Sequence, residues 1–166
     1  MYYDYLETPI GRILVAGSAE GLCQVGLPAA RHPVDIAPDW RRDAAPFREA
    51  RRQFDAYFAG TLSEFDLALA PRGSDFRQRV WRALRGIPYG VTISYAELAR
   101  RIDNPKASRA VGLANGANPL AIIVPCHRVI GANGSLTGYG GGLAAKQFLL
   151  DLERRHAPAQ GFALSP

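Results

Sequence analysis

Cysteine is scarce in this sequence, and so are histidine and lysine. The 166 residues include only two cysteines, Cys23 and Cys126, with three histidines and two lysines. Two cysteines cannot build a disulfide scaffold, and they are too few for a cysteine-rich structural zinc site. We therefore expect two free thiols and no bound metal.

Long apolar runs are missing as well. No segment approaches the roughly 18 consecutive apolar residues of a membrane-spanning helix. The opening stretch, MYYDYLETPIGRILVAG, has neither the basic region nor the continuous apolar region of a signal peptide. Hydrophobic residues make up 48% and charged residues 21% of the chain, which is typical of a globular protein. The sequence predicts a cytoplasmic protein with no membrane partner.

Charge is unevenly distributed along the chain. The net charge is +5, with 20 Lys and Arg against 15 Asp and Glu. Residues 1–72 carry 8 basic and 10 acidic side chains, whereas residues 73–166 carry 12 basic and 5 acidic side chains. A basic half favours a polyanionic partner such as nucleic acid, although a basic face can also be merely solvated. Charge alone leaves these two interpretations equally open.

The first 72 residues have the pattern of a small antiparallel sheet. Between residues 2 and 28, short aromatic and β-branched runs alternate with turn residues, which is typical of a strand meander. Residues 29–46 are rich in proline, alanine and charge, and we expect them to be irregular. Residues 64–70 alternate in part and could return as one more strand.

One helix accompanies this sheet. From Phe47 the apolar residues follow a helical spacing through Tyr57 and Phe58 until Gly60 stops the pattern. The breaker residues 71–73 coincide with the change in charge balance. We therefore expect an N-terminal structural domain over 1–72 and a second domain over 73–166.

The second domain is predicted to be mainly helical. Ser74 or Asp75 can cap a first helix, whose buried stripe includes Trp81. Ser94 and Glu97 have the spacing of a capping box, so a second helix should begin at Ser94.

A third helical stretch covers residues 108–115, after a break at Asn104–Pro105. Two short helices around a tight break match a helix-turn-helix layout, and they equally match an ordinary helical hairpin. A final amphipathic helix begins at Leu143.

The segment IIVPCHRVIG, residues 122–131, carries side chains that a buried apolar strand does not normally hold. An imidazole beside a thiol can lower the thiol pKa or accept its proton. On an extended strand, Cys126 and His127 would point to opposite faces, so they cooperate only if the backbone turns or a water bridges them. Glu153 could hold the imidazole in one tautomer. A buried structural cysteine and a core histidine remain possible, but the combination favours a catalytic cysteine.

The string PCHRVIG at residues 125–131 resembles the active-site motif of the O6-alkylguanine-DNA alkyltransferases. Further motifs stand at the order and spacing of that family, namely Ser94–Tyr95, Arg109–Gly112, Asn118–Pro119, Thr137–Leu143 and Leu149–Glu153. The resemblance is dense over residues 73–156 and extends to the first 70 residues only as a layout. It points to the short bacterial members with a single function.

The resemblance implies direct repair of DNA. An alkyl group would move from guanine O6, or from thymine O4, to Cys126 in one irreversible turnover. His127 would take the thiol proton through a water, Glu153 would orient His127, and Tyr95 would donate a hydrogen bond or proton toward the base. Asn118 would tie the recognition helix to the active-site segment.

The same resemblance implies a pocket for the alkylated base. The backbone carbonyls of Cys126 and Val129 would accept from the guanine amino group. Tyr139 would form an aromatic wall, and the N–H of Gly140 would donate to the base. Gly140 stands where the family commonly has serine or another small residue, which keeps the N–H and could leave a roomier pocket.

Duplex DNA carrying O6-alkylguanine would be the partner of a monomeric chain that needs no cofactor. A base inside a duplex is out of reach of a pocket, so the nucleotide must be flipped out. In the family, the second helix of the pair lies in the minor groove, where Arg109 would fill the gap in the stack. The implied DNA-binding residues are Ser94, Arg109, Ala110, Gly112 and Arg128.

These features define an α+β protein. A small N-terminal antiparallel sheet with a helix, ribonuclease H-like by resemblance, precedes a mainly helical domain with a winged helix-turn-helix-like motif. Two other functions remain open: a thiol hydrolase or acyl transferase that uses Cys126, His127 and Glu153, and a non-catalytic lesion-binding helix-turn-helix protein. Counting the alkyl groups transferred per chain distinguishes one, many and none.

Overall fold

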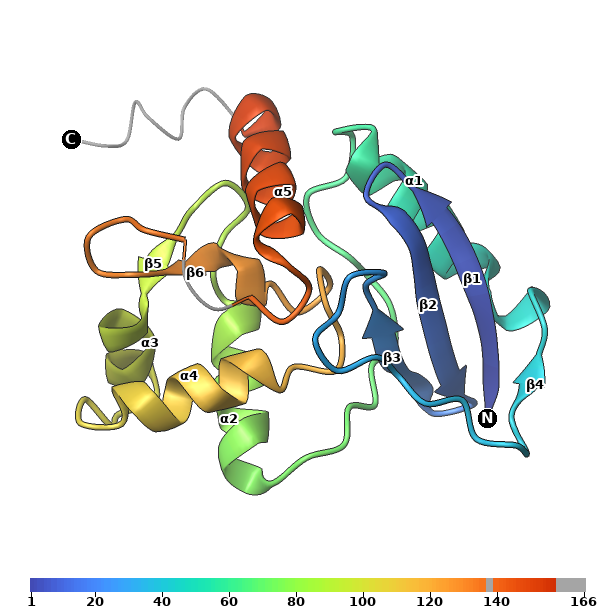
Figure 1. Cartoon of the computed structure of the whole chain (residues 1–166), viewed down its shortest axis with the longest axis horizontal. Helices are drawn as coiled ribbons and strands as arrows, with labels where there is room; N and C mark the ends of the chain where they lie inside the picture. The colour runs from blue at the N-terminus through green and yellow to red at the C-terminus, as the bar shows by residue number, and fades with distance from the viewer. Residues whose placement is uncertain (137–138, 158–166) are drawn as a thin grey trace.

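A computed structural model describes residues 1–136 and 139–157 and has the expected α+β fold (Figure 1). The N-terminal half holds a four-stranded sheet in the order β3-β2-β1-β4, with one helix against it. Its elements are β1 (Tyr2–Thr8), β2 (Gly11–Ser18), β3 (Gly21–Gly26), β4 (Arg41–Arg42), the 3-10 turn η1 (Ala45–Phe47) and α1 (Arg48–Phe58).

The strand meander is confirmed. β1 pairs antiparallel with β2, with Tyr2 opposite Gly17, and β2 pairs antiparallel with β3. The apolar stripe of α1 is buried through Phe54 and Tyr57, and Gly60, at φ +81°, lies just beyond the end of this helix. A positive φ is accessible to glycine at little cost, which is why the pattern stops there.

Two details of the N-terminal half differ from the prediction. The irregular segment 29–46 contains the short β4, which pairs parallel to β1. Residues 64–70 form no regular strand and make only an isolated bridge between Leu69 and Leu22. The side chain of Gln53 bonds both the N–H and the C=O of Asp66, at 2.8 and 2.9 Å, so these groups are not available to a strand ladder.

The C-terminal half is mainly helical. Its elements are α2 (Asp75–Arg85), β5 (Ile93–Ser94), α3 (Tyr95–Arg101), α4 (Ser108–Gly116), the 3-10 turn η2 (Cys126–Arg128), β6 (Val129–Ile130) and α5 (Leu143–His156). The caps are confirmed, since Ser74 accepts from the Arg77 N–H at 3.2 Å and Ser94 from the Glu97 N–H at 3.1 Å. Trp81 is buried, and its indole N–H donates to the Ala114 carbonyl at 2.9 Å, which joins α2 to α4.

The segment 122–131 is buried as expected, but it is not a strand. It runs through turns into η2, and only Val129 and Ile130 pair with β5. Pro125 has no N–H for a ladder, and Ile122 has φ +72°, so the backbone bonds locally instead. The Cys126 N–H donates to the Val124 carbonyl at 2.8 Å. This turn is the bend that the sequence required if Cys126 and His127 were to cooperate.

The two halves meet beside this segment. The Val25 N–H on β3 donates to the Pro119 carbonyl at 2.7 Å, and the Arg31 N–H donates to the Gly140 carbonyl at 2.6 Å. The first half therefore forms one side of the depression over Cys126.

Candidate active site

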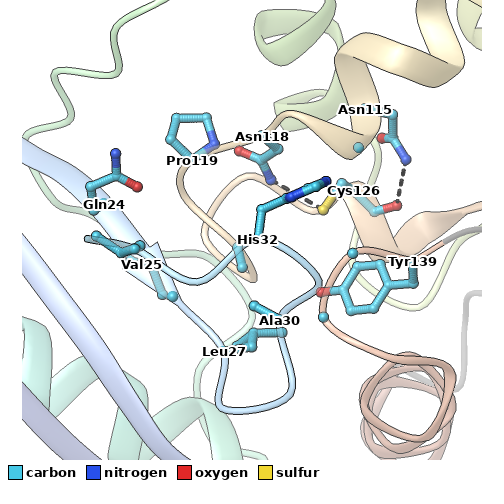
Figure 2. A pocket seen from close by; sticks show the side chains of 16 residues that line it. Gln24, Val25, Leu27, Ala30, His32, Asn115, Asn118, Pro119, Cys126 and Tyr139 are labelled. Carbon is cyan, nitrogen blue, oxygen red and sulfur yellow. Dashed lines mark hydrogen bonds between the residues drawn. The ribbon is translucent and has the colours of Figure 1, made fainter.

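Cys126 lies at the start of η2, at the base of an open pocket between the two halves (Figure 2). The pocket is lined by residues of both halves, including Leu27 and His32 from the first and Tyr139 from the second. Cys126 itself is only 6% exposed.

Two amide side chains from the end of α4 hold the cysteine. Asn118 Nδ2 donates to Cys126 Sγ at 3.1 Å and to the Val124 carbonyl at 2.8 Å, while the Leu120 N–H donates to Asn118 Oδ1 at 3.0 Å. Asn115 Nδ2 lies 3.4 Å from the Cys126 carbonyl (Figure 2). These bonds connect the thiol to the end of the helix that carries Arg109, and this is the link that the sequence assigned to Asn118.

The resting cysteine is a thiol. Burial raises the pKa of Cys126, because a thiolate loses solvation, and this outweighs the hydrogen bond from Asn118 and the nearby Tyr139 and Lys146. Those three groups all favour negative charge on sulfur. The site therefore stabilises charge that develops on the sulfur, but it does not hold a thiolate before substrate arrives.

His127 and Glu153 form a buried pair behind the cysteine. His127 Nε2 lies 2.7 Å from Glu153 Oε2, and both side chains are at most 1% exposed. Burial lowers the pKa of His127, and the bond to Glu153 only partly compensates. A neutral imidazole that donates from Nε2 carries its lone pair on Nδ1, and Nδ1 has no hydrogen-bond partner among the described residues. The geometry thus provides a neutral base of defined tautomer.

Glu153 remains ionised despite its burial. Burial alone would raise its pKa, but the hydrogen bonds and charges of His127 and Arg128 outweigh burial and lower it. Arg128 donates from Nε to Oε1 at 2.8 Å and from Nη2 to Oε2 at 2.9 Å.

Arg128 therefore has a different position from the one expected of a DNA contact. It is 7% exposed, and its remaining nitrogen, Nη1, donates to the Ile87 carbonyl at 2.7 Å. Its guanidinium is committed to Glu153 and to the backbone inside the protein. The motif shows only that an arginine follows His127, so its direction could not be inferred from sequence.

The loop before α5 covers one side of the pocket. Tyr139 is 5% exposed, and Gly140 lies close to α4 because a Cβ built on it would be 3.6 Å from the Gly116 carbonyl. Lys146 is buried, lies over the Tyr139 ring at 5.9 Å and donates to the Val129 carbonyl at 2.7 Å. That carbonyl keeps a second lone pair for a base. Thr137 and Gly138 of the family-like motif lie outside the described residues.

The remaining expected residues lie on β5, α3 and α4. Tyr95 packs beside Gly112, because a Cβ added there would be 3.8 Å from the ring. Arg109 and Ala110 are exposed, and Ser94 caps α3. The small side chains of α4 add little bulk to this face of the helix.

Sequence reasoning missed several residues at the site. Asn115 contacts the Cys126 carbonyl, and Tyr57 of the first half donates to Glu153 Oε2 at 2.6 Å. Lys146, which donates to the Val129 carbonyl, was also missed. A lysine in an otherwise apolar helical stripe was the one available signal, whereas Tyr57 has the spacing of an ordinary core residue.

The described part of the chain has neither a cluster of metal ligands nor a membrane-spanning helix. Residues 1–136 and 139–157 contain no group of three or more His, Cys, Asp or Glu side chains that could hold a metal ion. No helix within these ranges is long and apolar enough to cross a membrane.

The fold and the buried thiol place the molecule in a class of proteins that combine a small sheet domain with a helical domain carrying one reactive cysteine. Two family models match, the ribonuclease-like domain of 6-O-methylguanine DNA methyltransferase over residues 1–71 and its DNA binding domain over residues 75–155. The chain belongs to the 6-O-methylguanine DNA methyltransferase family.

Similar proteins support this assignment over nearly the full length. A methylated-DNA–protein-cysteine methyltransferase of Methanosarcina acetivorans is 58% identical, with 92% of this chain and 98% of the relative covered. A crystal structure of Mycobacterium tuberculosis OGT in complex with DNA matches with a TM-score of 0.88 and 52% identity, covering 96% of each chain. The methyltransferase of Pyrococcus kodakaraensis, at 24% identity and a TM-score of 0.65, shares the fold.

Proposed function

We propose that this chain repairs DNA by transferring an alkyl group from guanine O6 to Cys126, once per molecule. The observation that carries the proposal is the buried thiol, which accepts a hydrogen bond from Asn118 and lies next in sequence to the His127–Glu153 pair. Family membership supports the reaction, and the geometry supports the roles of the residues.

The reaction breaks the bond between the alkyl carbon and O6 and forms a bond between that carbon and Sγ. His127 accepts the thiol proton through a water, and Glu153 stabilises the resulting imidazolium. Guanine leaves with the electron pair on O6, and Tyr95 donates a hydrogen bond or proton toward the departing base. The product is a thioether, which water does not hydrolyse, so the protein is consumed.

The flipped base enters the pocket above Cys126. The carbonyls of Cys126 and Val129 accept from its amino group, Tyr139 stacks beside it, and the Gly140 N–H donates to it. In the resting structure Lys146 occupies one lone pair of the Val129 carbonyl, and its second lone pair serves the base. The Cys126 carbonyl already accepts from the Val129 N–H and from Asn115 Nδ2 at 3.4 Å, so the base takes the place of the long Asn115 contact.

The exposed face of α4 binds the minor groove. Arg109 takes the place of the flipped nucleotide, while Ser94, Ala110 and Gly112 allow close approach of the DNA backbone. The similar mycobacterial protein forms a complex with DNA, which supports DNA as the partner here. We assign Arg128 to the interior and not to this surface.

The remaining assignments follow from the same proposal. Residues 1–72 form the structural domain and residues 73–166 the domain that binds DNA and accepts the alkyl group. The chain acts as a cytoplasmic monomer, without a cofactor, on O6-alkylguanine and also on O4-alkylthymine.

Titration of the protein against duplex DNA with one O6-methylguanine tests the proposal. We expect one methyl group removed per active chain and no further repair when DNA is in excess. Repeated turnover would instead support a thiol hydrolase, and tight binding without transfer would support a non-catalytic lesion binder.

A further inference from the structure

Glu153 is surrounded by an unusually complete set of donors. Its two oxygens accept five hydrogen bonds, from Tyr57, His127, the Gly90 N–H and two nitrogens of Arg128. Oε2 is the crowded atom, because Tyr57 Oη at 2.6 Å, His127 Nε2 at 2.7 Å and Arg128 Nη2 at 2.9 Å all share it.

Tyr57 is the one donor that comes from the first half of the chain. It lies on α1, is fully buried, and packs edge-on to Tyr89 with ring centroids 6.3 Å apart. Burial, followed by the charge of Glu153, raises its pKa far above that of a free tyrosine. Tyr57 therefore keeps its proton and is a permanent hydrogen-bond donor to Oε2.

We propose that Tyr57 is a positioning residue of the alkyl-transfer site, which acts through Glu153 by taking up part of the charge on Oε2 so that His127 stays a neutral base. This inference rests on the proposed alkyl transfer to Cys126. It gives the first half of the chain a direct part in the chemistry.

Three donors compete for the single oxygen Oε2 of Glu153. A carboxylate oxygen that accepts several strong hydrogen bonds has less negative charge available for each of them. Without the Tyr57 hydroxyl, Oε2 becomes more basic and stabilises the imidazolium of His127 more strongly. Arg128 and the Gly90 N–H still hold the carboxylate in place, so the change is mainly one of charge.

Other groups around the pair do not change in this comparison. Besides Tyr57, those that face His127 or Glu153 are Arg128 on η2, Lys146 on α5, Tyr139 before α5 and Tyr89 after α2. Removing one hydroxyl alters none of their formal charges. A shift in the pH dependence is therefore attributable to Tyr57.

The test measures single-turnover transfer from free O6-benzylguanine against pH for the parent and for Tyr57→Phe. The free base requires no flipping, so the rate constant reports chemistry in the pocket, while the amplitude counts competent molecules. Because burial lowers the pKa of His127, the acid limb of the parent's pH–rate profile should lie below the pH at which a free imidazole titrates. Tyr57→Phe should move this limb upward by about half to one pH unit, which is a loss of about three- to tenfold at a fixed pH on the limb.

Tyr89→Phe is the matched control. It removes a hydroxyl from the same aromatic cluster, and the Tyr89 hydroxyl has no hydrogen-bond partner within the described part of the chain. We expect its pH limb to coincide with that of the parent. If Tyr57→Phe only weakens the fold, its amplitude falls and its limb stays in place, which overturns the inference.

A second readout does not depend on transfer. The ring ¹⁵N resonances of His127, assigned with His32→Gln and His156→Gln variants, should titrate at higher pH in Tyr57→Phe than in the parent. An unchanged or lower midpoint contradicts the positioning role. A parent that transfers nothing contradicts the proposed function itself, whereas a parent that transfers normally with no shift in Tyr57→Phe contradicts this inference alone.

Discussion

The two thiols of this chain are equally buried, yet their surroundings differ. Cys23 on β3 is 5% exposed and has only the Gly21 carbonyl at 3.7 Å as a polar contact of its sulfur among the described residues. Cys126 on η2 is 6% exposed but has Asn118 at its sulfur and Lys146 and Tyr139 nearby.

Burial therefore does not distinguish a reactive cysteine from a structural one. Cys23 lies within the strand β3, at the point where its register with β2 shifts, whereas Cys126 lies on a turn between two halves of the molecule. A turn can bring donors to the sulfur from several elements. What differs is the stabilisation available to charge that forms on sulfur during reaction.

The largest expected effect separates the two cysteines directly. Cys126→Ser should abolish transfer and leave DNA binding largely intact, because a hydroxyl is a far poorer nucleophile near neutral pH. Cys23→Ser should transfer at a rate close to that of the parent. Quenched reactions with duplex carrying a labelled O6-methylguanine measure the transfer rates of both variants. Transfer by Cys126→Ser would show that Cys126 is not the alkyl acceptor.

Asn118→Ala tests whether the donor at the sulfur matters. It removes the hydrogen bond to Sγ and leaves charge on Cys126 less stabilised, so transfer from O6-benzylguanine should slow by about 10- to 100-fold, the equivalent of one hydrogen bond to a charged group. Asn115→Ala removes a long contact to the Cys126 carbonyl and should cost less. Equal losses in both variants would show that packing at the end of α4, and not the sulfur contact, controls the rate.

Arg109→Ala separates the chemistry of the pocket from delivery of the base. Repair of duplex DNA should fall by about tenfold or more, whereas reaction with O6-benzylguanine should stay near the parent rate, because a free base needs no flipping. Arg48→Ala, which removes an exposed charge from α1, is the matched control. Equal losses on both substrates would place Arg109 in the pocket. Affinity for duplex should also decrease as salt is added.

Alkylation of Cys126 should destabilise the protein. The product adds at least a methyl group at a site that is 6% exposed, and overpacking of a buried site typically costs about 1–3 kcal/mol. Asn118 would transmit the strain to α4. Thermal melts should show midpoints in the order unreacted, methylated, benzylated, from highest to lowest. Three equal midpoints would mean that the pocket has room for its product and that no strain reaches α4.

The smallest expected effect concerns Gly140. A Cβ at this position would be 3.6 Å from the Gly116 carbonyl, an ordinary contact, and Gly140 is not among the glycines with positive φ. Gly140→Ser should therefore fold normally and keep its N–H, with a transfer rate within about twofold of the parent for a methyl adduct. A large loss would show that the open pocket mouth is needed for reaction at Cys126.

Local signals predicted much of this molecule. Ser74 and Ser94 marked helix starts because a side chain within one turn satisfies the free N–H groups. Short aromatic and β-branched runs between turn residues marked the first three strands. The turn at Cys126 was not predicted, because an apolar run has the same composition in a strand and in a buried turn.

Contacts between residues that are far apart in the chain could not be predicted from the sequence. Tyr57 reaches Glu153 over 96 positions, and nothing in the spacing of α1 distinguishes it from other core residues. The burial of Arg128 depends in the same way on where α5 brings Glu153. The motif identified which side chains take part, and the packing of the two halves decides how they are oriented.

Site-resolved mass spectrometry after reaction with O6-methylguanine duplex tests most directly whether Cys126 is the residue that accepts the alkyl group. We predict the mass of one methyl group on the peptide that contains Cys126, in proportion to the lesions removed, and an unmodified Cys23. A methyl group on Cys23, or complete repair with an unmodified Cys126, would contradict the account.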